Sequence, residues 1–145
     1  MNTDFISSQL SALPSLEVVP EEGLLKFLIT RYEMAFKSIV LDIPSYDSIG
    51  WWQHSFAYAR MLLINTGRNE KDAIRLLARK NNDYGNKGLR FTGSLGIVIR
   101  SLDKLYRLEN LQTVTSKVTT ESQADAVEDL FNYSILAYLL IAGEL

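Results

Sequence analysis

Two sets of charged residues in the C-terminal half of the chain have types and spacings suited to a phosphorylated ligand. The first set is mainly basic and repeats every three or four residues, which places it on one side of a helix: Arg100, Asp103, Lys104 and Arg107. The second set is mainly acidic and shares a second helical face: Glu121, Asp125, Glu128 and Asn132, with Asp129 beside them. Carboxylates one turn apart suit Mg²⁺, and Lys and Arg neutralise phosphate oxygens. We therefore expect phosphate at Arg100, Lys104, Arg107 and Lys80, and a divalent ion at Glu121, Asp125 and Asp129.

A glycine-rich stretch precedes the basic set. Residues 80–96 read KNNDYGNKGLRFTGSLG and hold four of the eight glycines in the chain. Backbone N–H groups that lack a neighbouring side chain approach an anion closely, so this stretch is a candidate phosphate-binding loop. It is not a nucleotide-binding P-loop, because Gly93 is followed by Ser-Leu and not by Lys-Ser or Lys-Thr. Lys80, Asp83 and Tyr84 are placed to add polar groups and a ring for stacking.

Apolar periodicity predicts the helices that must position these groups. The spacing from Leu24 to Phe36 indicates a helix over residues 21–40. Further helices are predicted over residues 48–65, 70–80, 95–111, and from about residue 120 almost to the C-terminus, with Asn69 capping the third. No alternating strand pattern of useful length occurs. The predicted fold is an all-α, single-domain bundle of about five helices, with the glycine-rich loop between helices three and four.

Length and composition agree with one soluble domain. The chain has 145 residues, 47% of them hydrophobic and 22% charged, and we expect a domain over residues 21–145 with a loosely attached leader over residues 1–20. The sequence contains no cysteine, which excludes disulfides, thiolate zinc sites and cysteine nucleophiles.

Charge and hydropathy limit the partners. The formal net charge of −2 provides no global basic field, so contact with nucleic acid would need a local patch. No signal-peptide pattern is seen at the start, and the most apolar run, residues 135–143, falls short of the ~20 residues that span a bilayer. We expect a cytoplasmic protein that does not enter membranes.

Aromatic residues suggest a possible subunit contact. Trp51 and Trp52 look exposed in the second helix, and with the apolar C-terminal helix they make a homodimer reasonable. His54, the single histidine, fits a hydrogen-bonded packing role better than catalysis.

Each charged set also has a simpler interpretation. The basic set matches a surface ladder of ion pairs, and acids near a helix start complement the helix dipole. The glycines fit two turns and a helix cap equally well. The coincidence of two opposite stripes, both bordered by apolar residues, with a glycine-rich stretch favours a binding site.

Three stretches resemble a known family. KNNDYG (80–85), GIVIRSLDKLYRLENL (96–111) and ESQADAVEDLFNY (121–133) are similar, in order, to the nucleotide modification associated domain 1 family of phages and bacteria. The resemblance covers roughly residues 70–140 and leaves the first seventy residues without a motif. It implies a context in nucleotide or nucleic-acid modification. It also implies roles for the following residues: Lys80, Asn81, Asp83, Tyr84, Gly85, Arg100, Asp103, Lys104, Arg107, Glu121, Asp125, Asp129 and Tyr133.

Three functions follow as hypotheses. The leading one is a domain that binds a nucleotide or a nucleotide-derived phosphate, with Mg²⁺ as its cofactor. An alternative is a Mg²⁺-dependent nucleoside triphosphate pyrophosphatase similar to the MazG kind, which holds the metal with two acidic helices. Asp125 and Glu128 match one of these helices, but the second is missing, because the third predicted helix offers only Glu70 and Asp72. The third is a structural or interaction protein whose charged stripes pair internally. Whether the chain is an enzyme stays open.

Overall fold

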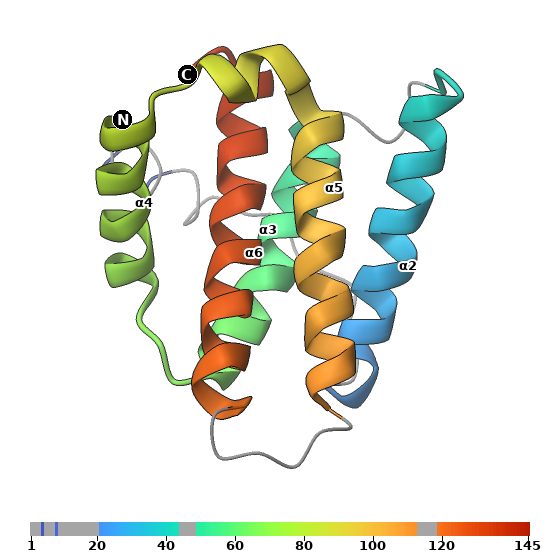
Figure 1. Cartoon of the computed structure of the whole chain (residues 1–145), viewed down its shortest axis with the longest axis vertical. Helices are drawn as coiled ribbons and strands as arrows, with labels where there is room; N and C mark the ends of the chain where they lie inside the picture. The colour runs from blue at the N-terminus through green and yellow to red at the C-terminus, as the bar shows by residue number, and fades with distance from the viewer. Residues whose placement is uncertain (1–3, 5–7, 9–20, 44–48, 113–118) are drawn as a thin grey trace.

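The structure is a computed structural model that describes residues 21–43, 49–112 and 119–145, together with Asp4 and Ser8. Five helices follow one another through the three continuous ranges (Figure 1): α2 (Glu21–Val40), α3 (Ile49–Asn65), α4 (Glu70–Tyr84), α5 (Lys87–Leu111) and α6 (Thr119–Ile141). These ranges contain no strand. The predicted all-α, single-domain bundle is confirmed, whereas the predicted leader lies outside the described residues except for Asp4 and Ser8.

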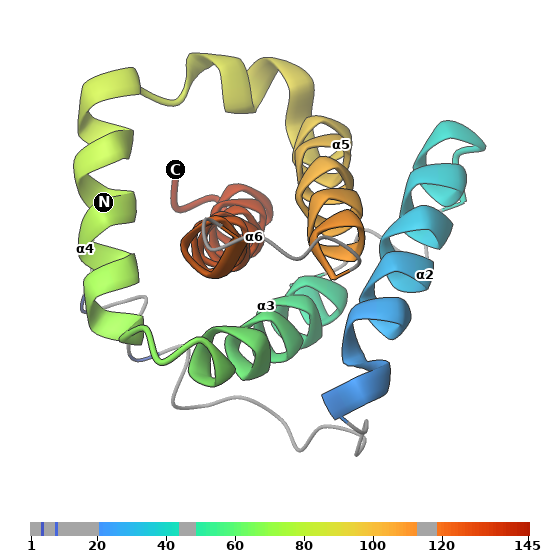
Figure 2. The same ribbon diagram turned by 60° about the horizontal axis from the view of Figure 1, so that its bottom comes forward.

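Helix α6 is the centre of the bundle. Figure 2 shows α6 nearly end-on with α3, α4 and α5 around it, and α6 contacts all three, while α2 packs on α5 and α3 from outside. The second half of α6 is mostly apolar, and its side chains from Leu130 to Leu139 are buried except for Tyr133. A helix of this kind must be enclosed by others, which explains its central place.

The tryptophan pair belongs to the core, so the prediction of exposed Trp51 and Trp52 is wrong. Trp52 is 0% exposed and Trp51 8%, and both rings pack edge-to-face against Tyr32. The Arg31 guanidinium lies 4.3 Å from the centre of the Trp51 ring. The two rings therefore supply no argument for a homodimer. His54 Nδ1 lies 2.7 Å from the Gly50 carbonyl oxygen, in agreement with a packing role.

Helix α4 begins where its sequence predicts and ends later. The Asn69 side chain accepts a hydrogen bond from the Lys71 backbone N–H at 2.7 Å, which confirms the predicted N-cap. The helix continues to Tyr84, four residues beyond the predicted end at Lys80. It stops at Gly85, whose φ of 69° and ψ of −174° are open to glycine but strained for other residues.

The glycine-rich stretch is mostly helical, which differs from the predicted loop. Only Gly85 and Asn86 separate α4 from α5, and α5 starts eight residues earlier than expected. The helix bends at Gly93, where φ is 62° and ψ is −157°. Short-range hydrogen bonds hold the first turns: the Arg90 N–H donates to the Asn86 carbonyl at 3.0 Å, and the Thr92 hydroxyl donates to the Gly88 carbonyl at 2.9 Å. Two glycine bends thus turn the chain across the end of the bundle, above α6 (Figure 1).

Among the described helices, none combines the length and the apolar composition that crossing a membrane requires.

Candidate functional site

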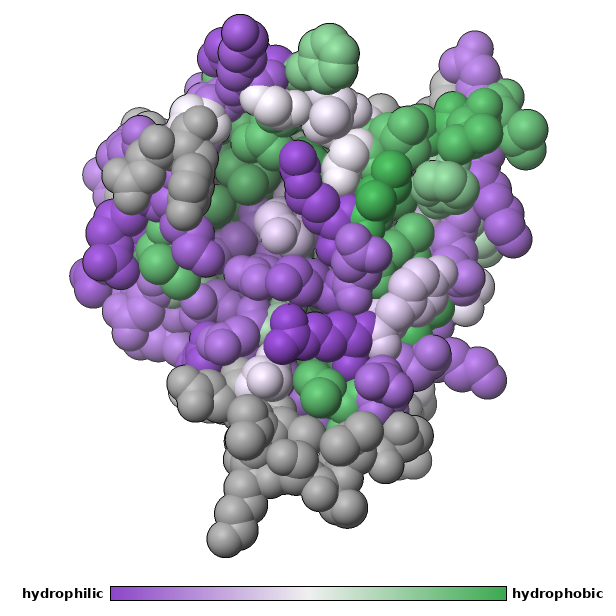
Figure 3. Space-filling view, in the orientation of Figure 1, coloured by the Kyte–Doolittle hydropathy of each residue, from purple (hydrophilic) through white to green (hydrophobic). Residues whose placement is uncertain are grey.

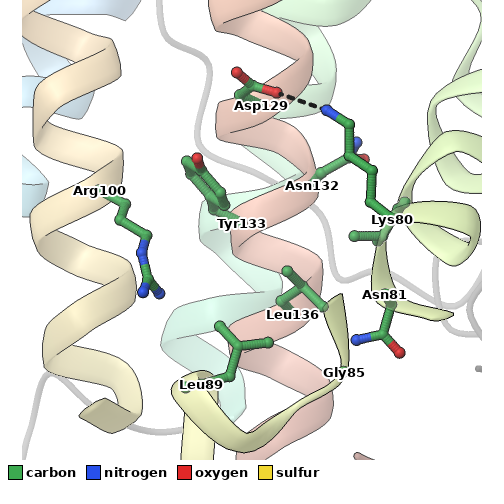
Figure 4. Close-up of a pocket in the computed structure, with 11 residues that line it drawn as sticks. Lys80, Asn81, Gly85, Leu89, Arg100, Asp129, Asn132, Tyr133 and Leu136 are labelled. Carbon is green, nitrogen blue, oxygen red and sulfur yellow. Dashed lines mark ion pairs between the residues drawn. The ribbon is translucent and has the colours of Figure 1, made fainter. Parts of the chain in front are cut away.

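A pocket of about 420 Å³ opens between α4, the first part of α5 and α6, and we call it the central pocket. Eleven residues line it, and most of them are labelled in Figure 4: Leu77, Lys80, Asn81, Gly85, Gly88, Leu89, Arg100, Asp129, Asn132, Tyr133 and Leu136.

One face of α6 supplies the floor of the pocket. Asp129, Asn132, Tyr133 and Leu136 are spaced three, one and three residues apart, so they occupy one stripe along the helix. The stripe runs from a carboxylate through an amide and a phenol to an aliphatic side chain. Polar groups therefore gather at one end of the floor and apolar groups at the other.

Asp129 joins the three helices around the pocket. Its Oδ2 lies 3.0 Å from Lys104 Nζ on α5, and its Oδ1 lies 3.8 Å from Lys80 Nζ on α4. The Asp129 and Lys104 side chains are about three-quarters buried, at 26% and 23% exposed, so solvent screens their pair less than a surface pair. Lys104 of the basic set and Asp129 of the acidic set therefore meet directly.

Arg100 brings a further positive charge to the pocket. Its side chain is partly buried and extends from α5 toward the space between α5 and α6 (Figure 4). No carboxylate among the described side chains lies within ion-pair distance of Arg100. Lys80 and Arg100, which line the pocket, outnumber its one carboxylate, Asp129, and Lys104 pairs with that carboxylate from α5, which leaves an excess of positive charge there.

Tyr133 lies within this field. Burial raises the pKa of the Tyr133 phenol above its ordinary value of 10.0, and the charge of Asp129 raises that pKa as well. The charges of Lys104 and Arg100 lower the same pKa, without reversing the shift. The phenol therefore remains protonated at neutral pH and offers an O–H donor beside an aromatic ring.

The turn between α4 and α5 closes one side of the pocket. Asn81 Nδ2 donates a hydrogen bond to Asn86 Oδ1, and the Gly85 N–H donates to the Asn81 carbonyl at 2.8 Å. Asn81 thus lines the pocket and also fixes the turn. Gly85 and Gly88 present backbone atoms to the pocket with no side chain in between.

Other predicted residues lie elsewhere. Asp103 is exposed and belongs to a second depression of about 280 Å³ between α2 and α5, which we call the α2–α5 groove. The groove is lined by Glu33, Phe36, Lys37, Ile99, Leu102, Asp103 and Tyr106. Arg107 is exposed and lines neither the pocket nor the groove. The basic stripe therefore divides between two sides of α5.

Asp125 is engaged away from the pocket. Its Oδ1 lies 2.7 Å from Arg68 Nη2, and Arg68 Nη1 lies 3.4 Å from Glu128 Oε2, so the connection between α3 and α4 is tied to α6. The side chains of Asp83, Tyr84 and Glu121 lie outside the described residues.

The magnesium prediction stays a prediction. The described side chains contain no group of three or more His, Cys, Asp or Glu residues that could hold a metal ion. Asp125 faces a guanidinium and Asp129 faces two ammonium groups, and these cations compete with a divalent ion for the carboxylate oxygens. As they stand, the two carboxylates serve ion pairs between elements.

Sequence reasoning placed Asn132 on the acidic face without giving it a role, and it did not select Leu136, Leu77 and Leu89. Asn132 and Leu136 carry a signal that could have found them, because they continue the helical stripe that starts at Asp129. Leu77 is one turn before Lys80 and shares its face. Leu89 had no such signal, since its place depends on the helical turn after Gly85.

Comparisons of the chain with protein-family models, with curated protein sequences and with solved structures found no match.

Proposed function

We propose that the protein binds a nucleotide, or a small phosphorylated derivative of one, in the central pocket. The observation that carries this proposal is the position of Arg100, a partly buried cation that lines the pocket without a carboxylate partner among the described side chains. A partly desolvated cation without a counter-charge is less favourable than one that an anion accompanies. A phosphate group supplies that anion, and guanidinium binds it through two parallel hydrogen bonds.

Size and lining also support a nucleotide-like ligand. Pockets for small molecules typically occupy about 300–1,000 Å³ and combine apolar walls with a few placed polar groups. The central pocket, at about 420 Å³, combines Leu77, Leu89 and Leu136 with cations and with the Tyr133 ring. In this proposal the phosphate lies at Arg100 and Lys104, and the remainder of the ligand lies against the aromatic and aliphatic lining.

The described residues favour binding without a built-in metal site. Mg²⁺ enters the proposal as an ion carried by the ligand phosphates, and of its predicted protein ligands Glu121, Asp125 and Asp129, the one that lines the pocket among the described side chains is Asp129. The pyrophosphatase alternative adds turnover, and release of pyrophosphate from nucleoside triphosphates in the presence of Mg²⁺ would establish it.

The proposal is tested by isothermal titration calorimetry on the full chain with tripolyphosphate and the four ribonucleoside triphosphates, with Mg²⁺ and with EDTA. The variants are Arg100→Met and, as a matched control on the same helix, Arg107→Met. Loss of one charge-assisted contact is expected to weaken binding by about tenfold or more in Arg100→Met, and the control should stay within about twofold.

A different result would support the structural alternative, in which Lys80, Asp129 and Lys104 only tie helices together. Absence of binding to every ligand at about millimolar concentration would contradict the proposal. Equal weakening in both arginine variants would also contradict it, because Arg107 lies outside the pocket.

A further inference from the structure

Asn132 is a buried side chain in the pocket that ion pairing and helix packing do not explain. It is 4% exposed, lies between Asp129 and Tyr133 on α6, and lines the central pocket. Figure 4 shows its amide on the side of α6 that faces α4, near Lys80, whereas Tyr133 lies toward α5. A helix as apolar as this half of α6 has no packing need for an amide at this position.

The Asn132 carbonyl oxygen has no hydrogen-bond donor among the described residues. Its Oδ1 is buried and unpaired in the structure. Most buried polar atoms in proteins have a partner, and an unpaired one calls for an explanation such as a ligand or a bound water. Asn132 lines the cavity of about 420 Å³ while its Oδ1 has almost no accessible surface, so a ligand in the cavity reaches this atom after a rotation of the amide.

The missing partner must be a hydrogen-bond donor. A carbonyl oxygen only accepts, and ionised phosphate oxygens also only accept, so a phosphate group cannot satisfy Oδ1. Nucleobases carry N–H groups on their edges, and an amide side chain complements such an edge by accepting and donating together. Leu77 and Leu136, which line the same pocket, suit the flat apolar faces of a base.

We infer that Asn132 recognises the nucleobase of the ligand by accepting a hydrogen bond from an N–H group on the base edge, and so determines specificity. This inference rests on the proposed function and assigns the two ends of the ligand. The phosphate lies at Arg100 and the base lies at Asn132. It predicts that the protein distinguishes a nucleotide from a bare polyphosphate.

The test compares tripolyphosphate with the most tightly bound ribonucleoside triphosphate by calorimetry, on the wild-type chain and on Asn132→Leu. The variant keeps the side-chain volume and removes the amide, and an apolar side chain replacing an unpaired polar one should fold normally. Nucleotide affinity is expected to fall by about tenfold or more, whereas tripolyphosphate affinity should stay within about twofold. Asn82→Leu makes the same change at an exposed position of α4 outside the pocket and should alter neither affinity.

Two further arms keep the inference falsifiable. If Asn132→Leu does not fold, Asn132→Ala removes the same amide and replaces it in every measurement. The 2′,3′-dideoxy form of the nucleotide lacks both ribose hydroxyls, and it should be as sensitive to the Asn132 variant as the ribonucleotide. If its binding is insensitive, the donor is a ribose hydroxyl and the inference about the base is wrong.

The outcomes separate this inference from the proposed function. If nucleotides bind and Asn132→Leu leaves their affinity unchanged, the base contact is wrong and the proposed function stands. Equal weakening of nucleotide and tripolyphosphate would likewise overturn the base contact. If the wild-type chain binds none of these ligands, the proposed function itself fails.

Discussion

The two sides of α5 carry surfaces of different character, although they are built from neighbouring residues. Arg100 lines the central pocket and Asp103, less than one turn later, lines the α2–α5 groove. At the pocket, the exposed Lys80 of α4 and the partly buried Lys104 of α5 converge on one carboxylate of α6. In the groove, Glu33, Lys37 and Asp103 lie among exposed apolar side chains, and the Tyr106 hydroxyl donates to Glu33 at 3.0 Å.

The difference between the two surfaces indicates that a candidate site is distinguished from a solvated face by how deeply its charges are buried and by how many helices bring them together, more than by the sign of the charges. Exposed charges are screened by water and contribute little to stability or binding. Charges held by three helices against an apolar wall interact more strongly and in fixed directions. Figure 3, seen from one face, shows hydrophilic residues over the middle of the molecule and hydrophobic residues over the upper part of α2.

Charge reversal on the two sides of α5 should give the largest difference in ligand affinity between the pocket and the groove. Arg100→Glu places a negative charge in the central pocket and is expected to weaken tripolyphosphate binding by about a hundredfold, because it removes a charge-assisted contact and adds repulsion. Lys37→Glu makes the same change in the groove and should alter binding by less than about twofold. Calorimetry on both variants checks this, and similar losses in the two would mean that long-range charge, and not the pocket, governs binding.

The glycine bends beside the pocket should be more sensitive than the regular helix between them. Ala at Gly85 or Gly93 would be forced into backbone angles that suit only glycine, so each change is expected to lower the free energy of unfolding by about 1–3 kcal/mol. Gly88→Ala is the control. Gly88 is helical and a Cβ there meets nothing within 4 Å, so alanine should be neutral or stabilise by up to ~1 kcal/mol. Urea unfolding measures all three.

Asp129→Asn should distinguish an anion-binding pocket from a metal site, because the two predict opposite changes in ligand affinity. Removal of the carboxylate frees Lys80 and Lys104, so tripolyphosphate affinity in EDTA is expected to rise severalfold, with a loss of stability of about 1 kcal/mol or less. Asp103→Asn, in the exposed groove, should change affinity by less than about twofold. If Asp129→Asn instead abolishes a binding reaction that requires Mg²⁺, Asp129 is a metal ligand as the sequence predicts.

The smallest expected effect is on stability at alkaline pH, and it concerns one tyrosine in the pocket and one in the groove. Burial and the charge of Asp129 raise the pKa of Tyr133 in the pocket, and burial and Glu33 raise the pKa of Tyr106 in the groove. A phenol with a raised pKa stabilises the folded state while it is protonated, so this contribution is present below the ordinary pKa of 10.0 and is lost as the pH rises above it. Tyr133→Phe should therefore reduce the alkaline loss of stability.

Melting temperatures at pH 8, 9.5 and 10.5 test this comparison. The melting temperature should fall less between pH 8 and pH 10.5 in Tyr133→Phe than in Tyr106→Phe, because Tyr106 is 43% exposed and its interaction with Glu33 is screened. The buried Tyr32, whose pKa burial raises far above 10.0, contributes the same background in both variants. A larger effect from Tyr106 would show that the groove is less solvated than its exposure indicates.

Most of the fold follows from local signals, whereas part of the candidate site does not. Residues from Leu24 to Phe36 have helical apolar spacing, and α2 has the predicted bounds. The Asn69 cap is as local, because its side chain bonds within two residues. Trp51 and Trp52 could not be assigned this way, since exposure depends on Tyr32 packing against them from another helix.

Local sequence signals alone predict that this chain forms helices and that charged stripes accompany them, because helix spacing and capping act over a few residues. Only the tertiary structure decided which charges meet. Lys104 and Asp129 approach because α5 and α6 pack side by side, while Asp125 pairs with Arg68 from the α3–α4 connection. The same holds for Asn132, because an amide is ordinary in a helix and becomes informative only when packing buries it at a cavity.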